Sequence, residues 1–255
     1  MFFGVVFNAA SSVATMLQGI IKSFTFNTTA AFRPQIIKKY ATGDYDEMIK
    51  LMNTSLSLAI FLSLLISLPL FIETDYLMKF WLVNPPTMAP EFARLLIVSA
   101  LFAMMTVIFT IGIEATGHNK QVNIYTGTIY MLTIPVMYIL FRMGSGVLFS
   151  YYCIIGANVV IFLSNIVIFK FLMPKLHLLS CLFLILRSFI VAIVSILPAY
   201  LFVNQYVDEC FFRLVINIII TVGIYLCLSY FVILDSSSRE FLRNKMLKLF
   251  KNHRH

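Results

Sequence analysis

The chain has little charge and few of the side chains that carry enzyme chemistry. Only 12% of its 255 residues are charged and 60% are hydrophobic, whereas a soluble domain is close to a quarter charged. It has four histidines and four cysteines, and no two cysteines form a C-x-x-C pair. Neither a phosphate-binding G-x-x-x-x-G-K-[ST] loop nor a G-x-S-x-G nucleophile motif occurs. The sequence therefore predicts neither an enzyme nor a cofactor or metal site.

Long apolar runs are abundant instead. The mean hydropathy is +0.92, and about 20 consecutive apolar residues are enough to cross a bilayer as a helix. The runs are continuous and do not alternate in short segments as the strands of a membrane β-barrel do. These features predict an all-α polytopic membrane protein with about seven transmembrane helices. The expected spans are residues 5–32, 52–72, 92–115, 121–141, 147–172, 179–203 and 211–234.

Lysine and arginine are distributed unequally between the two sides of this topology. One set of connecting segments holds 13 of them and the other set holds only Lys79 and Arg142. Cytoplasmic segments carry the excess of positive charge in membrane proteins, so we expect the N-terminus outside and the C-terminus in the cytoplasm. The net charge of +8 is thereby explained without a nucleic-acid partner. The positive segments are residues 33–51, 116–120, 170–178 and 235–255.

The C-terminal tail, residues 236–255, has the pattern of a basic amphipathic helix. Ser237-Ser238-Arg239-Glu240 is a capping box, and four apolar residues then follow at helical spacing. Basic residues accompany them, which is typical of a helix that lies on an anionic membrane surface. We expect the tail to bind anionic lipids of the inner leaflet. The apolar residues are Leu242, Met246, Leu249 and Phe250.

The first span is unusually polar for a transmembrane helix. A series of polar residues advances along it by three or four positions, which places them on one helix face. Lys22 lies near mid-depth of the span, where a cation costs at least about 2.5–3.5 kcal/mol against lipid. We therefore expect this face to line a substrate cavity; the alternative is a lysine that packs between helices and bonds a neighbouring carbonyl. The face comprises Asn8, Ser11, Thr15, Gln18, Lys22 and Thr29.

Glu114 is the second candidate for a functional role. It lies within one turn of the cytoplasmic end of the third span. A carboxylate at that position is either a helix-end group that meets water or a proton or cation site. We keep it as the candidate for ion coupling.

Several segments resemble polysaccharide (O-antigen, Wzx-type) flippases of the MATE-like superfamily. The resemblance covers roughly residues 2–175, and the last two spans are similar in hydropathy only. The segments that carry it are, in order, Phe2-Phe3-Gly4, Asn8-Ala9-Ala10, Pro34-Gln35-Ile36-Ile37-Lys38, Tyr40-Ala41, Gly43-Asp44-Tyr45, Pro69-Leu70, Glu73-Thr74, Trp81-Leu82, Ala115-Thr116-Gly117 and Lys120.

The resemblance implies a particular architecture and activity. Family members have twelve to fourteen helices in two lobes around a central cavity. Residues 1–175 would form the C-terminal lobe without the first lobe, residues 176–235 would add two helices, and residues 236–255 would be the tail. The implied activity is the flipping of a lipid-linked oligosaccharide on undecaprenyl pyrophosphate across the bacterial inner membrane, by alternating access, for polysaccharide or lipopolysaccharide biosynthesis. The missing lobe could be supplied as a separate chain.

Two other functions stay open at this point. The chain could be a non-catalytic scaffold or accessory subunit of an envelope glycan-assembly complex. A membrane-embedded acyl- or glycosyltransferase is disfavoured by the missing acid, base and nucleophile pairs. A wet cavity lined by the first, third and fourth spans would favour transport, and a tightly packed bundle would favour the scaffold.

Overall fold

The computed structural model describes residues 5–82, 84–203, 207–234 and 239. All the regular structure in this part of the chain is helical, which confirms the predicted all-α class. The helices are α1 (Val5–Ala30), α2 (Arg33–Ala41), α3 (Tyr45–Ile72), α4 (Thr74–Trp81), α5 (Ala89–Ala115), α6 (Asn119–Arg142), α7 (Leu148–Leu172), α8 (Leu178–Pro198), the π-helix η1 (Ala199–Val203) and α10 (Phe211–Val232).

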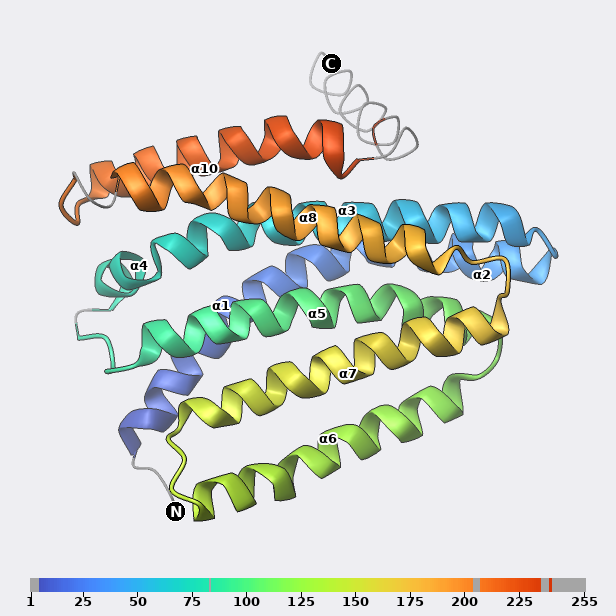
Figure 1. The fold of residues 1–255 in the computed structure, drawn as a ribbon, viewed down its shortest axis with the longest axis horizontal. Coiled ribbons are helices and arrows are strands. Elements are labelled where there is room, and N and C mark those ends of the chain that lie inside the picture. The colour runs from blue at the N-terminus through green and yellow to red at the C-terminus, as the bar shows by residue number, and fades with distance from the viewer. Residues whose placement is uncertain (1–4, 83, 204–206, 235–238, 240–255) are drawn as a thin grey trace, which may run out of the picture.

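The long helices run side by side, and the connections between them gather at two opposite ends (Figure 1). One end holds α2 and the connections 116–118 and 173–177, and we call it the α2 end. The other holds α4 and the connection 143–147, and we call it the α4 end. Within the described residues, six helices are long and apolar enough to cross a membrane: α3, α5, α6, α7, α8 with the start of η1, and α10. The chain is thus a multi-pass helical membrane protein.

Helix α1 is the one predicted span that does not meet the same criterion of apolarity. Its 26 residues correspond to about 39 Å, which is enough to span a bilayer. It also passes from the α4 end to the α2 end behind α5, as the other long helices do (Figure 1). Its polar residues lower the hydropathy below that of its neighbours. The structure therefore supports six strongly apolar spans and one polar helix of comparable length.

Two segments that were expected to be loops are short helices. At the α2 end, α2 begins with Pro34 in its first turn and buries Ile36, a position at which proline suits a helix. At the α4 end, Trp81 closes α4 and is 51% exposed. Both helices are amphipathic, so contact with the bundle can stabilise lengths that would be marginal in water.

The turn between α2 and α3 is closed by an ion pair. Lys39 Nζ donates to Asp44 Oδ2 at 2.7 Å. This hydrogen bond lowers the pKa of the Asp44 carboxyl and raises the pKa of the Lys39 ammonium. Gly43 sits between them with φ of +74°, a left-handed conformation that glycine adopts without a steric penalty.

The centre of the bundle lies where α3, α5 and α7 meet. At Gly112, helix α5 packs closely against both α3 and α7. A Cβ atom placed there would lie 2.6 Å from Met52 Cε on α3 and 2.8 Å from Phe169 Cε2 on α7. Small residues allow this close packing of helices in membranes.

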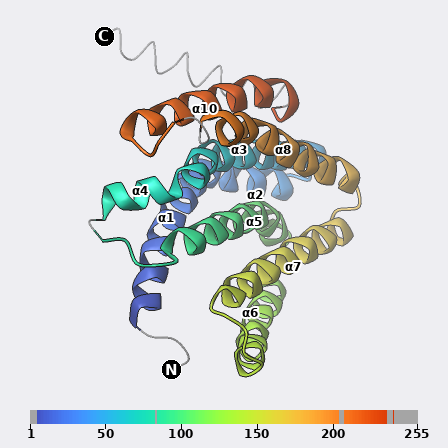
Figure 2. The same cartoon turned by 60° about the vertical axis from the view of Figure 1, so that its left-hand side comes forward.

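Helix α6 lies at the edge of the bundle, beside α7 (Figures 1 and 2). Met131 on its outer face is 73% exposed, as expected for a lipid-facing side chain. Two asparagines of α7 bind α6 to the bundle, since each accepts a hydrogen bond from a tyrosine of α6 and donates one to a hydroxyl of α5. The bonds are Tyr130 Oη to Asn158 Oδ1 (2.8 Å), Asn158 Nδ2 to Ser99 Oγ (2.8 Å), Tyr125 Oη to Asn165 Oδ1, and Asn165 Nδ2 to Thr110 Oγ1 (3.1 Å).

Helices α8 and α10 form a layer over α3 (Figure 2). Tyr225 of α10 is fully buried, and its hydroxyl donates to Phe61 O of α3 at 3.0 Å. The division into a lobe of residues 1–175 and two additional helices in 176–235 stays a prediction. The predicted amphipathic tail, residues 236–255, lies outside the described residues except for Arg239.

Candidate functional site

The predicted polar face lies at the border of the contact between α1 and α5. The buried side of α1 is formed by apolar residues such as Ala14 and Ile21, which are fully buried. Asn8 and Thr15 are exposed, whereas Gln18 donates from Nε2 to Leu96 O of α5 at 3.1 Å. The polar face is therefore partly exposed and partly in contact with α5.

Hydrogen bonds within α1 satisfy part of this face. Thr15 Oγ1 donates to Ser12 O at 2.8 Å, and Ser12 Oγ donates to Asn8 O at 2.9 Å. Ser11 interacts with the hydroxyl of Tyr151 on α7. The hydroxyl protons of Ser12 and Thr15 are therefore already engaged with backbone carbonyls of α1.

Thr29 does not share the exposure of the other members of the face. It is 2% exposed, and its hydroxyl donates to Thr25 O at 3.1 Å. A spacing of seven residues falls short of two full α-helical turns by about 20°, so the offset grows to roughly 60° between Asn8 and Thr29. The expectation that Thr29 belongs to the same face is wrong for this reason. We call the remaining five residues, Asn8, Ser11, Thr15, Gln18 and Lys22, the polar stripe.

Lys22 is the unusual member of the polar stripe. Its side chain is half-buried, and it lies eight residues before the end of α1, or about 12 Å. No hydrogen bond or ion pair links it to another residue in the described part of the chain. The alternative role in packing required a neighbouring carbonyl as acceptor, and none of the described carbonyls accepts from Lys22.

Glu114, by contrast, is paired. Its carboxylate lies 2.7 Å from Nη2 of Arg33, the first residue of α2, and the Glu114 side chain is 17% exposed. The pair joins the end of α5 to the start of α2. This arrangement is the one expected for a helix-end carboxylate, and ion coupling through Glu114 stays a prediction.

Comparison with known proteins does not indicate a function for the chain. The chain matches no family model, no curated protein and no solved structure. The resemblance to polysaccharide flippases therefore rests on the short segments quoted above. A group of three or more histidine, cysteine or carboxylate side chains that could hold a metal ion is absent from the described residues.

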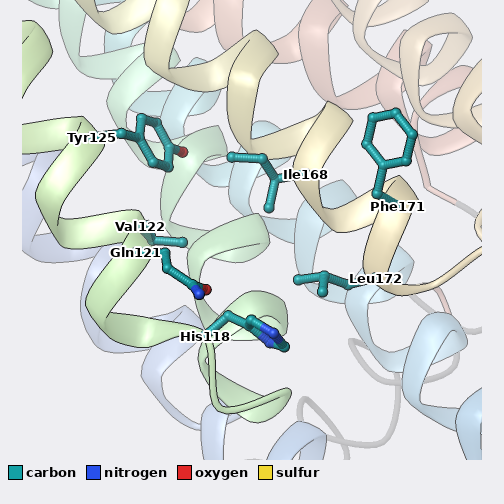
Figure 3. Close-up of a pocket in the computed structure, with 7 residues that line it drawn as sticks. All are labelled: His118, Gln121, Val122, Tyr125, Ile168, Phe171 and Leu172. Carbon is teal, nitrogen blue, oxygen red and sulfur yellow. The ribbon is translucent and has the colours of Figure 1, made fainter.

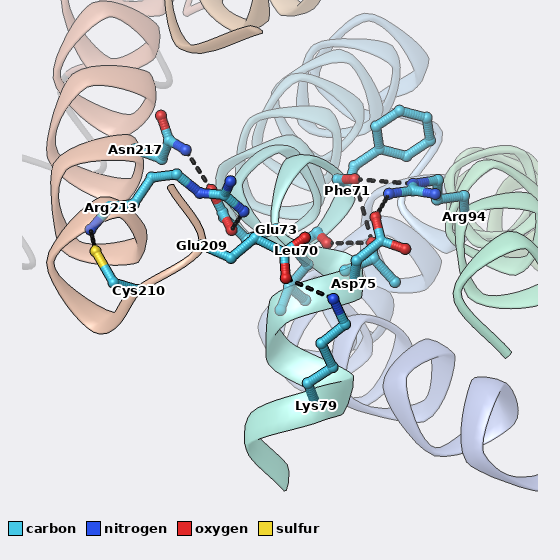
Figure 4. Close-up of polar contacts among 11 residues, drawn as sticks. Leu70, Phe71, Glu73, Asp75, Lys79, Arg94, Glu209, Cys210, Arg213 and Asn217 are labelled. Atoms are coloured by element: carbon cyan, nitrogen blue, oxygen red, sulfur yellow. Dashed lines mark hydrogen bonds and ion pairs between the residues drawn. The ribbon is translucent and has the colours of Figure 1, made fainter. Parts of the chain in front are cut away.

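A buried ion cluster at the α4 end was not foreseen from the sequence (Figure 4). Glu73, between α3 and α4, is fully buried, and its Oε2 atom lies 3.1 Å from Arg213 Nη2 on α10. Asn217 Nδ2, one turn further along α10, donates to Glu73 Oε1. The cluster joins residues about 140 positions apart, so no local pattern could have revealed it. Both carboxylate oxygens of Glu73 are engaged by α10, which marks the cluster as a structural clamp between α3 and α10.

Two further ion pairs surround this clamp. Asp75 of α4 binds Arg94 of α5, and Lys79 of α4 lies 2.5 Å from Glu209, just before α10. Figure 4 shows that all three pairs converge on the short helix α4. They explain why α4 keeps its place at the end of the bundle.

A mostly apolar cavity of about 160 Å³ lies between α6 and α7, close to the α2 end (Figure 3). His118, Gln121 and Tyr125 line its polar side, and Ile168 and Phe171 its apolar side. A second cavity of about 430 Å³ shares Tyr125 and Ile168 with it. Neither cavity includes a residue of the polar stripe. Whether the polar stripe lines a cavity between α1, α5 and α6 stays a prediction.

Proposed function

We propose that this chain forms one lobe of a membrane transporter that flips a lipid-linked oligosaccharide, carried on undecaprenyl pyrophosphate, across the bacterial inner membrane. One observation carries the proposal: Lys22, half-buried on a helix that passes from one end of the bundle to the other, has no partner among the described residues. A cation at that depth costs several kcal/mol unless an anion or water compensates it. A pyrophosphate would supply the compensating charge.

The rest of the polar stripe suits the other half of such a substrate. Sugars are recognised through hydroxyl groups, which both donate and accept hydrogen bonds. Asn8 and Thr15 are exposed beside Lys22 on the same helix, and Ser11 is part-exposed between them. These amides and hydroxyls can exchange hydrogen bonds with an oligosaccharide while it passes the membrane.

A second wall is needed for this surface to become a cavity. The polar stripe lies at the border of the contact between α1 and α5, so only one side of it is covered by this chain. We propose that a second lobe, as a separate chain, covers the other side. Alternating access would then consist of the two lobes rocking about the stripe.

We also propose that the α2 end faces the cytoplasm. The cations of the positive segments 33–51, 116–120 and 170–178 lie at this end (Figure 1). At the α4 end, Lys79, Arg94 and Arg213 are each paired with a carboxylate. Arg142, also at the α4 end, donates to Tyr138 Oη and is in no ion pair with a described residue. More of the Lys and Arg residues still lie at the α2 end, and the cytoplasmic side of a membrane protein carries the excess of these residues.

A membrane scaffold is the second candidate. The close approach at Gly112 favours it, because a bundle packed this tightly at its centre has no room for a pathway through the chain itself. A scaffold would use the exposed apolar faces of α1 and α6 to hold partner proteins. The two candidates differ in what they require of Lys22.

The test is the activity of Lys22 variants in a flippase-deficient host that displays a surface glycan, with the second lobe supplied. Lys22→Gln should reduce display at least about tenfold, the effect of losing one charge-assisted hydrogen bond, while the amount of protein in the membrane stays normal. Lys22→Arg should retain more activity, because the charge remains. Lys38→Gln, at an exposed position of α2, is the matched control and should leave display unchanged. Normal display by Lys22→Gln at normal abundance would exclude the substrate contact and favour the scaffold.

A further inference from the structure

A groove along the seam between α6 and α7 is formed by the two cavities beside α6. The cavities, of about 160 and 430 Å³, share Tyr125 and Ile168 and therefore adjoin. Tyr125 is fixed in the wall that they share, because its hydroxyl donates to Asn165 of α7. We call the two cavities together the α6–α7 groove.

The α7 wall of the groove is apolar and faces outward from the bundle. Leu163, Val167 and Phe171 line it at intervals of four residues, so they form one row along α7. All three are exposed, although α7 is one of the helices apolar enough to cross a membrane. The row therefore offers its apolar surface to a hydrocarbon chain of the bilayer.

The length of the groove matches one leaflet. Leu163 lies nine residues before the end of α7 at Leu172, which corresponds to about 14 Å of helix. The hydrocarbon core of a bilayer is about 30 Å thick, so a groove of this length extends from the membrane surface at the α2 end to near the middle of the membrane. One acyl chain of a lipid in that leaflet covers the same depth.

The end of the groove at the membrane surface is polar (Figure 3). His118 Nδ1, just before α6, lies 3.0 Å from Thr116 Oγ1, and the Thr116 hydroxyl already donates to Ile113 O. The proton in the first contact therefore belongs to Nδ1, which leaves Nε2 as an acceptor in the neutral ring. Nε2 has no partner among the described residues. Gln121, in the first turn of α6, adds its amide to the same end.

The charge beside this end favours an anionic headgroup. Lys120, exposed at the start of α6, is in no ion pair with another described residue. The carboxylates described at the α2 end are already paired with cations; they are Asp44, Asp46, Glu47 and Glu114. A phosphate at the surface would thus meet a cation that lacks a partner within the described structure.

We propose that the α6–α7 groove binds one phosphatidylglycerol from the leaflet at the α2 end. One acyl chain lies along the row Leu163, Val167 and Phe171, and the headgroup lies at the polar end. There a glycerol hydroxyl donates to His118 Nε2, and the phosphate lies beside Lys120. Basic groups at the membrane surface recognise anionic headgroups in this way. The groove shares no residue with the polar stripe, so the site is independent of the proposed transport function.

The test uses the full chain in bilayers of phosphatidylcholine that contain a small fraction of phosphatidylglycerol with a photoactivatable diazirine in its acyl chain. Crosslinks are mapped by mass spectrometry and should concentrate in residues 118–125 and 163–172. The outer face of α6, with Met131 and Ile134, is exposed but lines neither cavity, and it should be labelled far less. Equal labelling of both surfaces would show the ordinary lipid shell only and would overturn the site.

A matched pair of variants tests the place of the acyl chain. Ser164→Leu fills the larger of the two cavities and should lower the labelling of residues 163–172 to that of the outer face of α6. Thr128→Leu adds the same side chain at an exposed position of α6 outside the groove and should leave the labelling unchanged. Equal effects of the two variants would overturn the assignment of the chain to the groove.

A second pair tests the headgroup, with the same label carried by phosphatidylglycerol or by phosphatidylcholine. His118→Phe removes the Nε2 acceptor and should reduce the preference for phosphatidylglycerol about two- to tenfold, the effect of one hydrogen bond. His177→Phe changes an exposed histidine at the same end of the bundle and should leave the preference as it is. Equal labelling by the two lipids in the unmodified chain, or equal losses in the two variants, would overturn the headgroup assignment.

Discussion

Replacing Glu73 by glutamine should destabilise the protein far more than any exposed charge substitution. Glu73→Gln keeps the shape of the side chain but removes the negative charge that faces Arg213. The Glu73 side chain is fully buried and that of Arg213 is 11% exposed. The arginine would therefore be left as a buried cation without its anion.

The size of the effect follows from this burial. Removing one partner of a buried ion pair typically costs about 3–5 kcal/mol, because the other charge stays desolvated. In a chain of this size, each kcal/mol corresponds to about 2–4 °C in the unfolding temperature. We expect Glu73→Gln to lower the unfolding temperature by roughly 6–20 °C. Glu209→Gln breaks the pair with Lys79, in which the side chains are 40% and 58% exposed, and should cost only about 0.2–1 kcal/mol.

The measurement is thermal unfolding of the purified chain in detergent, followed by the fluorescence of Trp81. This residue is the only tryptophan, and it ends the same short helix α4 that the ion pairs hold in place. The double variant Glu73→Gln/Arg213→Gln should recover most of the lost stability, because no buried charge remains unpaired. The reasoning is refuted if Glu73→Gln shifts the unfolding temperature no more than Glu209→Gln, or if the double variant is less stable than Glu73→Gln alone.

Three other predictions follow from the packing and the topology. Gly112→Ala should destabilise the bundle by about 1–2 kcal/mol in thermal unfolding. Overpacking costs about 1–3 kcal/mol, and the gain in helix propensity offsets at most about 1 kcal/mol. An unchanged or higher unfolding temperature would contradict the close packing at Gly112. Tyr125→Phe removes the bond to Asn165 and should cost about 0.6 kcal/mol in the same assay, the average for hydrogen bonds between membrane helices, whereas a loss above about 2 kcal/mol would indicate a larger role for α6. In a cysteine-free background, an impermeant thiol reagent should label Asn84→Cys but not Thr42→Cys in intact cells, and the opposite pattern would reverse the proposed orientation.

The spans were predictable because hydropathy is a local property. The free energy of transferring a segment to lipid depends on its own residues. The six apolar helices therefore lie close to their predicted positions. The helix α1 shows the limit of this reasoning. A stripe of polar residues, with Lys22 among them, reduces its hydropathy without shortening it, and sequence alone could not tell whether the polar face meets helices, water or a partner.

The ion clamp could not be predicted, because pairing is a property of the folded chain. Arg213 was visible as a cation near the outer end of a span, and Glu73 as an acid in a short connection. Nothing in either neighbourhood indicates that α10 returns to lie beside the end of α3.

The two asparagine bridges of α7 have a consequence for how α6 can move. Asn158 and Asn165 are seven residues apart, and their partners on the antiparallel helix α6, Tyr130 and Tyr125, are five residues apart. A rotation of α6, or a slide by one turn of about 5.4 Å, would break both bonds at once and would find no equivalent pair. The two bridges thus specify a single register, so α6 and α7 should travel together as one rigid pair in any conformational change, and a hinge must lie elsewhere.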